Sequence, residues 1–203
     1  MRALVTGMMT PVGLFVVRRL AEMGFQVTAA GTASSDFSLH SKAVKRRLVF
    51  PSIRYQPERF ARAVLDELAS GDYDIYVPTF EDGFVMSYYA EEINKYARFI
   101  SMPFESILFV HDKGNMARFG QRIGVPPPNP TFVPVSRAEL PAIFEAVDCP
   151  VVVKPRRKCN AHGQAVLDDP KRLPEVYADL LARQGADDED LPMIQRRVRG
   201  PVL

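Results

Sequence analysis

The sequence predicts an α/β protein whose first region is a parallel sheet with helices on both faces. An apolar strand, residues 2–6, leads through a turn containing Gly7 and Gly13 into a helix that ends at Gly24. Strand-like and helix-like patterns then alternate as far as residue 101, and this alternation is typical of parallel sheets. With 203 residues, 47% of them hydrophobic, the chain is long enough to bury a core in one or two domains.

The other elements of this first region follow from the same patterns. Glu81 comes directly after an expected strand, at the end where parallel sheets bind ligands, so a contact with a substrate is one interpretation. The other is that Glu81 and Asp82 begin a helix, where acidic side chains favour the helix dipole. The expected strands are residues 26–30, 48–50, 74–78 and 98–101, and the expected helices are residues 57–69 and 83–94.

The glycine turn resembles a dinucleotide-binding fingerprint only in part. Thr10 occupies the position of the middle glycine, which lets the backbone approach a pyrophosphate. We therefore expect Gly7 and Gly13 to serve the tight turn and the packing of the helix. Short-chain dehydrogenases begin in a similar way, but they need a Tyr-x-x-x-Lys pair, and no tyrosine of this chain has a lysine four residues later. An NAD(P)-binding protein is thus the less favoured alternative.

The segment 148–163 organises the second region. A short apolar strand, residues 149–153, carries Lys154 at its end, and Pro155 then begins a basic loop that Gly163 closes. A lysine fixed at the end of a strand, beside a loop rich in hydrogen-bond donors, suits a nucleoside triphosphate. The alternative is a surface lysine followed by a solvated basic turn.

A second lysine begins a helix. Asp112 is expected to cap the helix 113–123, which places Lys113 in the first turn, where a cation opposes the helix dipole. An anion bound nearby would remove this conflict. The remaining expected elements are strands at residues 131–133, 164–167 and 193–198 and helices at residues 137–147 and 170–183.

The composition argues against several classes of function. The formal net charge is +2 and the cations are scattered, which argues against a nucleic-acid partner. No run of residues is apolar enough to span a membrane, and Met1 is followed at once by a core strand, so no membrane partner and no signal peptide are expected. The cysteines, Cys149 and Cys159, form no CxxC pair, which is typical of a reduced, cytoplasmic protein.

Taken together and in order, the landmarks of the second region resemble those of the ATP-grasp superfamily. They are Asp112-Lys113 at the start of a helix, Gly124-Val-Pro-x-Pro, Thr131, Pro150-Val-Val-Val-Lys154-Pro155, Gly163 and Met193-Ile-Gln-Arg-Arg-Val-Arg-Gly200. The chain is most similar to the carbamoyl-phosphate-synthetase-like and biotin-carboxylase-like branch. This resemblance implies a Rossmann-like preATP-grasp domain, residues 1–110, followed by the N-terminal part of an ATP-grasp nucleotide-binding domain, residues 111–203.

The resemblance also implies roles for particular residues. Lys113 and Lys154 would reach the phosphates of ATP as full positive charges. The loop 156–163 is similar to the flap that folds over the triphosphate. Residues 195–198 look like the hinge, where the Gln195 side chain would face the adenine amine and backbone groups would hold the purine. The ATP-binding residues implied in this way are Lys113, Lys154, Arg156, Gly163, Gln195, Arg196 and Val198.

The implied activity is that of an ATP-dependent ligase. Such an enzyme activates a carboxylate as an acyl phosphate, which an amine or a similar nucleophile then attacks. Its cofactors would be ATP and Mg²⁺, and its small-molecule carboxylate substrate would lie in part against the first domain, near Glu81. The alternative is a non-catalytic nucleotide-binding or regulatory module.

The chain departs from the family pattern in three places. The flap holds a single glycine, Gly163, and Val202 stands where many ligases have a glutamate that reaches the ribose. The metal-binding acids of the family follow the hinge, so we expect the Mg²⁺ ligands outside this chain and no catalytic residue within it, and Asp168 and Asp169 are interpreted as turn and cap residues. We therefore expect the front portion of a longer enzyme, whose uncovered apolar surface would favour self-association, a homodimer included.

Overall fold

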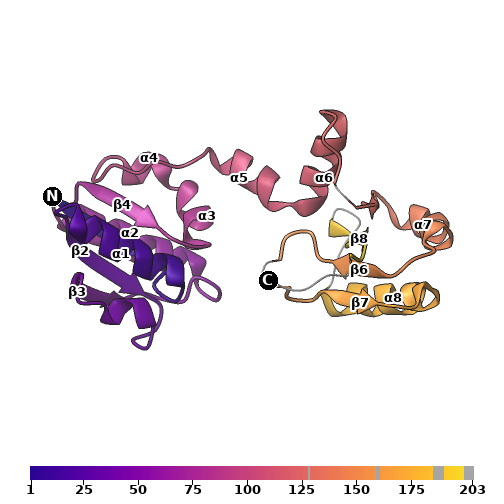
Figure 1. Ribbon diagram of the computed structural model, residues 1–203. Coiled ribbons are helices and arrows are strands. Elements are labelled where there is room, and N and C mark those ends of the chain that lie inside the picture. Colours follow the sequence, from indigo (N-terminus) through magenta and orange to yellow (C-terminus); the bar gives the residue numbers. More distant parts are fainter. Residues whose placement is uncertain (128, 159–160, 185–189, 199–203) are drawn as a thin grey trace. The chain divides into compact units, whose positions relative to one another are not determined.

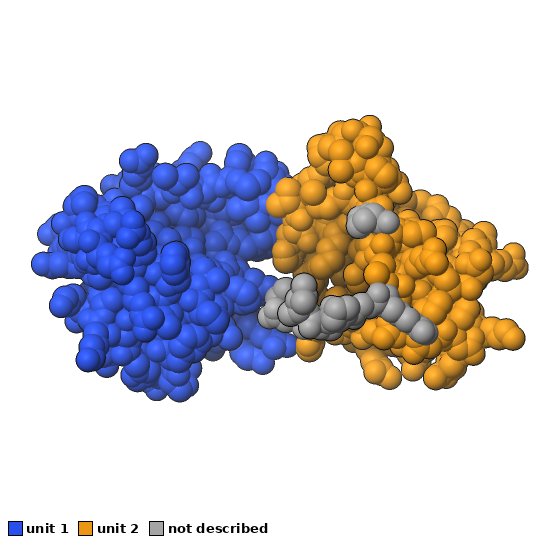
Figure 2. Space-filling view, viewed as in Figure 1, with its two compact units in different colours: residues 1–107 blue, residues 108–203 orange. Residues whose placement is uncertain are grey.

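The computed structural model describes residues 1–127, 129–158, 161–184 and 190–198. The chain divides into two compact units, Met1–Ile107 and Leu108–Leu203, which Figure 2 colours separately. Each unit contains a sheet of its own (Figure 1). None of the described helices is long and apolar enough to cross a membrane.

The sheet of the first unit is parallel, as the sequence predicts. Its strands lie in the order β3 (Val44–Val49), β2 (Gln26–Gly31), β1 (Arg2–Thr6) and β4 (Ile75–Pro78), and every pairing is parallel. The interior strand β1 is apolar on both of its sides, because Ala3, Leu4 and Val5 are all fully buried.

Helices cover both faces of this sheet. Ala3 and Val5 belong to one core cluster with Val17 of α1 (Pro11–Glu22). Leu4 projects to the opposite face and belongs to a second cluster with Val64 of α2 (Pro57–Ser70). The shorter helices of this unit are the 3-10 helix η1 (Phe37–His40), α3 (Asp82–Ser87) and α4 (Ala90–Ile93).

Two boundaries in this unit differ from the expectation. The third strand was expected at residues 48–50 but already begins at Val44, because charged side chains are tolerated on a strand at the edge of a sheet. The helix expected at residues 83–94 is divided into α3 and α4. Ser87 Oγ donates to the Phe84 carbonyl at 2.7 Å near that break, a local bond that competes with the helical ladder.

The expected fifth strand, residues 98–101, is reduced to a single parallel bridge between Arg98 and Ile75. Arg98 uses both of its backbone groups in this bridge: its N–H donates to the Asp74 carbonyl and its carbonyl accepts from the Tyr76 N–H, both at 3.0 Å. The Asn94 side chain binds the next residue, Phe99, whose backbone groups point away from β4. It donates to the Phe99 carbonyl at 3.1 Å and accepts from the Phe99 N–H at 2.9 Å. A second rung would need an N–H from Pro78 of β4, which proline lacks, and the ladder does not continue.

The sheet of the second unit is antiparallel. Its strands lie in the order β5 (Thr131–Phe132), β8 (Met193–Arg196), β6 (Val151–Lys154) and β7 (Ala165–Leu167). The expected elements of this region are present, with the strand ends shifted by at most two residues. The helices of this unit are α6 (Lys113–Arg122), α7 (Leu140–Ala146) and α8 (Leu173–Gln184), and the 3-10 turns η2 (Arg137–Glu139) and η3 (Pro170–Arg172) precede the last two.

One face of this second sheet is covered by helices. Val151, Val153 and Ile194 form a core cluster with Leu173 and Tyr177 of α8. We call the opposite face the exposed sheet face, and it carries the side chains of Thr131, Val152, Lys154, Val166 and Gln195.

One helix not predicted from the sequence, α5 (Phe104–His111), spans the boundary between the two units. Five of its eight residues are apolar, yet none is buried. Four of these, residues 107–110, are consecutive and so lack the amphipathic spacing that a sequence-based prediction uses.

Candidate functional site

Four side chains form one row across the exposed sheet face. The register pairs Val166 of β7 with Val152 of β6, Val152 with Gln195 of β8, and Gln195 with Thr131 of β5. Directly paired residues on neighbouring strands project to the same face, so the row is apolar at the β7 end and polar at the β5 end. Lys154 lies two residues beyond Val152 on β6 and projects from this face as well.

Hydrogen bonds join the polar atoms of this face. Lys154 Nζ donates to Gln195 Oε1 at 2.7 Å, and Gln195 Nε2 donates to Thr131 Oγ1 at 3.0 Å. Partial burial lowers the pKa of Lys154, and the positive charge of Lys113 lowers it further. The face therefore presents a partly desolvated ammonium whose hydrogen-bond partner, a glutamine amide, carries no balancing charge.

The strand edge at the end of β8 carries a backbone acceptor and a backbone donor. Arg196 N–H donates to the Pro130 carbonyl at 2.9 Å, but Pro130 has no N–H with which to return a bond to the Arg196 carbonyl. Arg197 N–H donates toward the other neighbour, to the Pro150 carbonyl at 2.8 Å. In an extended chain the N–H of Val198 then points to the same side as the carbonyl of Arg196.

Lys113 begins α6, and Asp112 caps this helix as predicted. Asp112 Oδ1 accepts from two N–H groups of the first turn, at 2.8 and 3.1 Å. Lys113 Nζ donates to the carbonyl oxygen of Arg156, at 3.3 Å, and to that of Lys158. The start of the loop between β6 and β7, which is the expected flap, therefore holds this ammonium.

The Arg156 side chain, which is expected to contact a phosphate, is held by a buried carboxylate. Its side chain is 5% exposed and forms a bidentate ion pair with Asp112, whose side chain is 2% exposed. The two hydrogen bonds of this pair measure 2.8 Å, from Nε to Oδ1, and 2.6 Å, from Nη2 to Oδ2. Arg157 lies outside this pair, half exposed, with its Nε 3.4 Å from Asp112 Oδ2.

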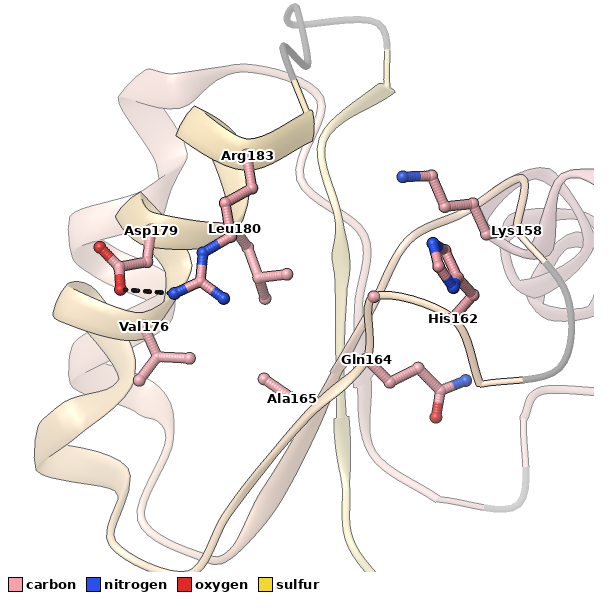
Figure 3. A pocket seen from close by; sticks show the side chains of 9 residues that line it. Lys158, His162, Gln164, Ala165, Val176, Asp179, Leu180 and Arg183 are labelled. Carbon is pink, nitrogen blue, oxygen red and sulfur yellow. Dashed lines mark hydrogen bonds and ion pairs between the residues drawn. The ribbon is translucent and has the colours of Figure 1, made fainter.

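The expected flap also forms one wall of a pocket of about 420 Å³, whose other wall is α8 (Figure 3). Gly163 lines this pocket and has a φ of 72°, in the left-handed region that favours glycine. Ala165 also lines it and is paired with Val153 of the covered face, so the pocket lies on the α8 side of β7, away from the exposed sheet face. Cys159 lies outside the described residues.

In the first unit, Glu81 is exposed just beyond β4, and its proposed contact with a substrate stays a prediction. Its neighbour Asp82 begins α3 and is 3% exposed. Asp82 accepts from Thr6 Oγ1 and from the Phe80 N–H, the latter at 2.7 Å. Burial raises the pKa of Asp82, although these hydrogen bonds oppose the rise. Asp82 therefore fixes the turn that carries Glu81.

The glycine turn after β1 serves the backbone, as expected. Thr10 caps α1 by accepting from the Gly13 N–H at 3.3 Å. Gly7 has a φ of 82°, and a Cβ added there would lie 2.5 Å from Thr79 Oγ1. Thr79 Oγ1 in turn donates to the carbonyls of Thr6 and Gly7, at 2.8 and 3.1 Å.

Solved structures with the same arrangement decide the fold. The biotin carboxylase domain of Hydrogenobacter thermophilus 2-oxoglutarate carboxylase, crystallised with MgADP, ADP and bicarbonate, matches 96% of this chain with a TM-score of 0.69 and 18% identity. The L-amino acid ligase of Bacillus licheniformis matches 98% with a TM-score of 0.67 and 20% identity. The biotin carboxylase of Campylobacter jejuni matches 97% with a TM-score of 0.68 and 18% identity. All three are ATP-grasp enzymes. This chain has the fold of the front portion of an ATP-grasp enzyme.

The resemblance predicted from the sequence is thereby confirmed for the fold. The chain covers 43%, 45% and 45% of those three structures, and so spans less than half of their length. No protein-family model and no curated protein matches it.

The ATP-grasp fold brings several of the expected residues together. Lys154 and Gln195 are in contact, and Lys113 lies at the loop that follows Lys154. The bond from Gln195 to Thr131 and the pair of Asp112 with Arg156 join residues 64 and 44 positions apart, and no local sequence signal indicates them. Among the described residues no group of three or more His, Cys, Asp or Glu side chains could hold a metal ion. Arg199, Gly200 and Val202 lie outside the described residues.

Proposed function

We propose that the second unit binds ATP against its exposed sheet face. The observation that carries this proposal is the contact between Lys154 and Gln195. It sets a cation suited to phosphate groups directly beside the strand edge at Arg196, which is suited to the edge of a base. Val152 and Val166 supply apolar surface on the same face, and the face of a purine needs such surface.

At the phosphate end, Lys113 and Lys154 supply the charge. An ammonium group loses part of its hydration when it is held against the protein. Burial and the charge of Lys113 already lower the pKa of Lys154. A polyanion between the two ammonium groups would relieve both effects, because an opposite charge within a few ångströms favours the charged form of lysine. The protein's part is to hold and orient the phosphates.

At the base end, the backbone determines the choice of purine. The Arg196 carbonyl can accept from the exocyclic amine of adenine, and the Val198 N–H can donate to the neighbouring ring nitrogen. Guanine presents an acceptor and then a donor along the same edge, which is the reverse pattern. We therefore propose that this edge prefers adenine to guanine nucleotides.

The fold extends the proposal to a reaction class. We propose that this chain is the nucleotide-binding portion of a carboxylate–amine ligase that forms an acyl phosphate, with Glu81 as a contact for the substrate. Mg²⁺, when bound, would neutralise charge on the triphosphate. The described residues offer no cluster of metal ligands, so we assign the ion to none of them. A cytoplasmic location and self-association as a homodimer belong to the same proposal.

A thermal-shift titration tests the nucleotide site. We expect Mg-ATP and Mg-ADP to raise the melting temperature of the chain, and Mg-GTP and NADH to leave it unchanged. A ligand at a hundred times its Kd stabilises by about 2.7 kcal/mol. In Lys154→Met the shift caused by ATP should be lost. The shift, and not the melting temperature itself, is compared, because removing a partly buried cation also changes the stability of the free protein.

Lys158→Met is the matched control. The Lys158 side chain lines the pocket on the α8 side, and only its backbone carbonyl contacts Lys113. This variant should therefore keep the shift caused by ATP. A shift with NADH but not with ATP would contradict the proposal and return attention to the Gly7 turn, and so would the absence of a shift with every nucleotide.

A further inference from the structure

Asp112 and Arg156 form a buried ion pair, and the proposed nucleotide site uses neither of these two charged groups. The guanidinium donates to both carboxylate oxygens, at 2.8 and 2.6 Å, and Nη2 also reaches Asn115 Oδ1 at 3.3 Å. A bidentate pair fixes orientation as well as distance. Because both side chains are almost fully buried, moving Arg156 toward a ligand would leave the buried Asp112 carboxylate with only the half-exposed Arg157, at 3.4 Å, as a charge partner.

This ion pair belongs to a double connection between α6 and the start of the loop. The Arg156 side chain holds Asp112, while the Arg156 carbonyl accepts from the Lys113 N–H at 3.1 Å and from Lys113 Nζ at 3.3 Å. Lys154 stands two residues before Arg156, at the end of β6. Arg156 therefore connects Lys113 to the strand that ends at Lys154.

A glycine makes room for this connection. A Cβ on Gly114 would lie 2.5 Å from Arg156 Nε and 2.8 Å from Val133 Cγ1. Gly114 is the second residue of α6, and glycine is less favourable than alanine in a helix. Its presence fits a site where the guanidinium packs directly on the helix backbone.

We infer that Asp112 and Arg156 are positioning residues: their ion pair sets Lys113 beside Lys154 and holds its ammonium on the carbonyls of residues 156 and 158. Arg156 then acts on a bound phosphate through Lys113 and does not touch it. Resting on the proposed function, the inference has a regulatory consequence. A phosphate that takes Lys113 must displace the two loop carbonyls, so nucleotide binding loosens the start of the loop.

The first test needs no nucleotide. Arg156→Lys keeps the charge but loses the bidentate geometry, and Arg157→Lys makes the same change at the neighbouring, half-exposed arginine. The pKa of Lys154 is measured by NMR on isotopically methylated lysines, with Lys154→Arg to assign the signal. We expect an upward shift in Arg156→Lys, because Lys113 moves away, and none in Arg157→Lys. An unchanged pKa in a folded Arg156→Lys protein would overturn the inference.

A second variant keeps the inference testable if Arg156→Lys does not fold. Asp112→Asn retains a good helix cap and removes only the charge partner. Loss of a nearby carboxylate by itself would lower the pKa of Lys154, whereas release of Lys113 would raise it. A rise therefore supports the positioning role, and a fall refutes it.

The second test adds ATP and separates this inference from the proposed function. We expect calorimetry to show ATP affinity weakened by about tenfold or more in Arg156→Lys, since small misplacements of a binding group are costly, and little change in Arg157→Lys. Equal affinities in wild type and Arg156→Lys would contradict the positioning role. If wild type binds no nucleotide, the proposed function fails, while the pKa of Lys154 still decides whether the ion pair positions Lys113.

Discussion

Replacing Gly114 by alanine sets two physical effects against each other. Gly114 is the second residue of α6, and alanine is favoured over glycine in a helix by at most about 1 kcal/mol, the value for a helix interior. Helix propensity alone therefore predicts a more stable protein. The contacts of the added methyl group predict the opposite, since it would lie 2.5 Å from Arg156 Nε.

The structure gives the size of the second effect. To reach an ordinary separation of 3.4 Å, Arg156 must retreat by 3.4 − 2.5 = 0.9 Å, which breaks its 2.8 Å bond to Asp112. Overpacking costs about 2 kcal/mol, and a lost hydrogen bond between charged groups costs about 2 kcal/mol. After the gain of about 1 kcal/mol from helix propensity, we expect the free energy of unfolding to fall by about 3 kcal/mol.

Urea unfolding followed by far-UV circular dichroism measures this change, because the chain contains no tryptophan for fluorescence. Hydrogen exchange of the α6 amides shows whether the loss is centred there. Gly83→Ala is the matched control: Gly83 also lies in a helix, but its added Cβ would meet only Pro78, at 3.4 Å. Stabilisation of Gly114→Ala, similar to that of the control, would refute the reasoning and mean that Arg156 is not held against the helix.

Three further predictions concern pH and the first unit. Burial acts to raise the pKa of Asp112, but hydrogen bonds from Arg156 and the helix N–H groups outweigh it and lower the pKa. The stabilising contribution of Asp112 is therefore lost as the pH falls through its folded-state pKa. Urea unfolding of Asp112→Asn should accordingly show a smaller dependence of stability on acid pH than wild type. Burial raises the pKa of Asp82, so stability falls as the pH rises from about 4 through its folded-state pKa, a decline that Asp82→Asn should remove. Gly7→Ala should lower the free energy of unfolding by about 3 kcal/mol, because of the positive φ of Gly7 and the clash with Thr79. Gly24→Ala, with a φ of 87° and no atom within 4 Å, should lower it by only about 1 kcal/mol. Equal losses of stability in these two variants would refute the clash.

Much of the fold could be predicted because its signals are local. The alternation of strands and helices, the cap at Asp112 and the turn at Gly7 depend on residues a few positions apart, so their types and spacing indicate them. The fifth strand failed for a reason that lies outside its own residues, since the rung after Arg98 would need an N–H from Pro78 of β4. No propensity or periodicity within residues 98–101 indicates what the neighbouring strand can donate.

The candidate site divides in the same way. Lys113 and Lys154 could be named from the sequence, because each stands at the end of a regular element where a cation needs an explanation. The pairing of Arg156 with Asp112 could not be predicted from the position of Arg156 in a basic loop. Whether an arginine in such a loop faces a phosphate or a buried carboxylate depends on what packs against it.

The sequence by itself therefore determined the order of elements and the residue types placed at their ends. Only the tertiary structure decided that Arg156 pairs with Asp112, 44 positions away, that Gln195 joins Lys154 to Thr131, and that Asp82 is buried against Thr6, 76 positions away. Such partners are set by strand register and by the packing of helices on sheets. Burial makes the pairings of Asp112 with Arg156 and of Asp82 with Thr6 obligatory, because a polar group removed from water must find its partner within the protein.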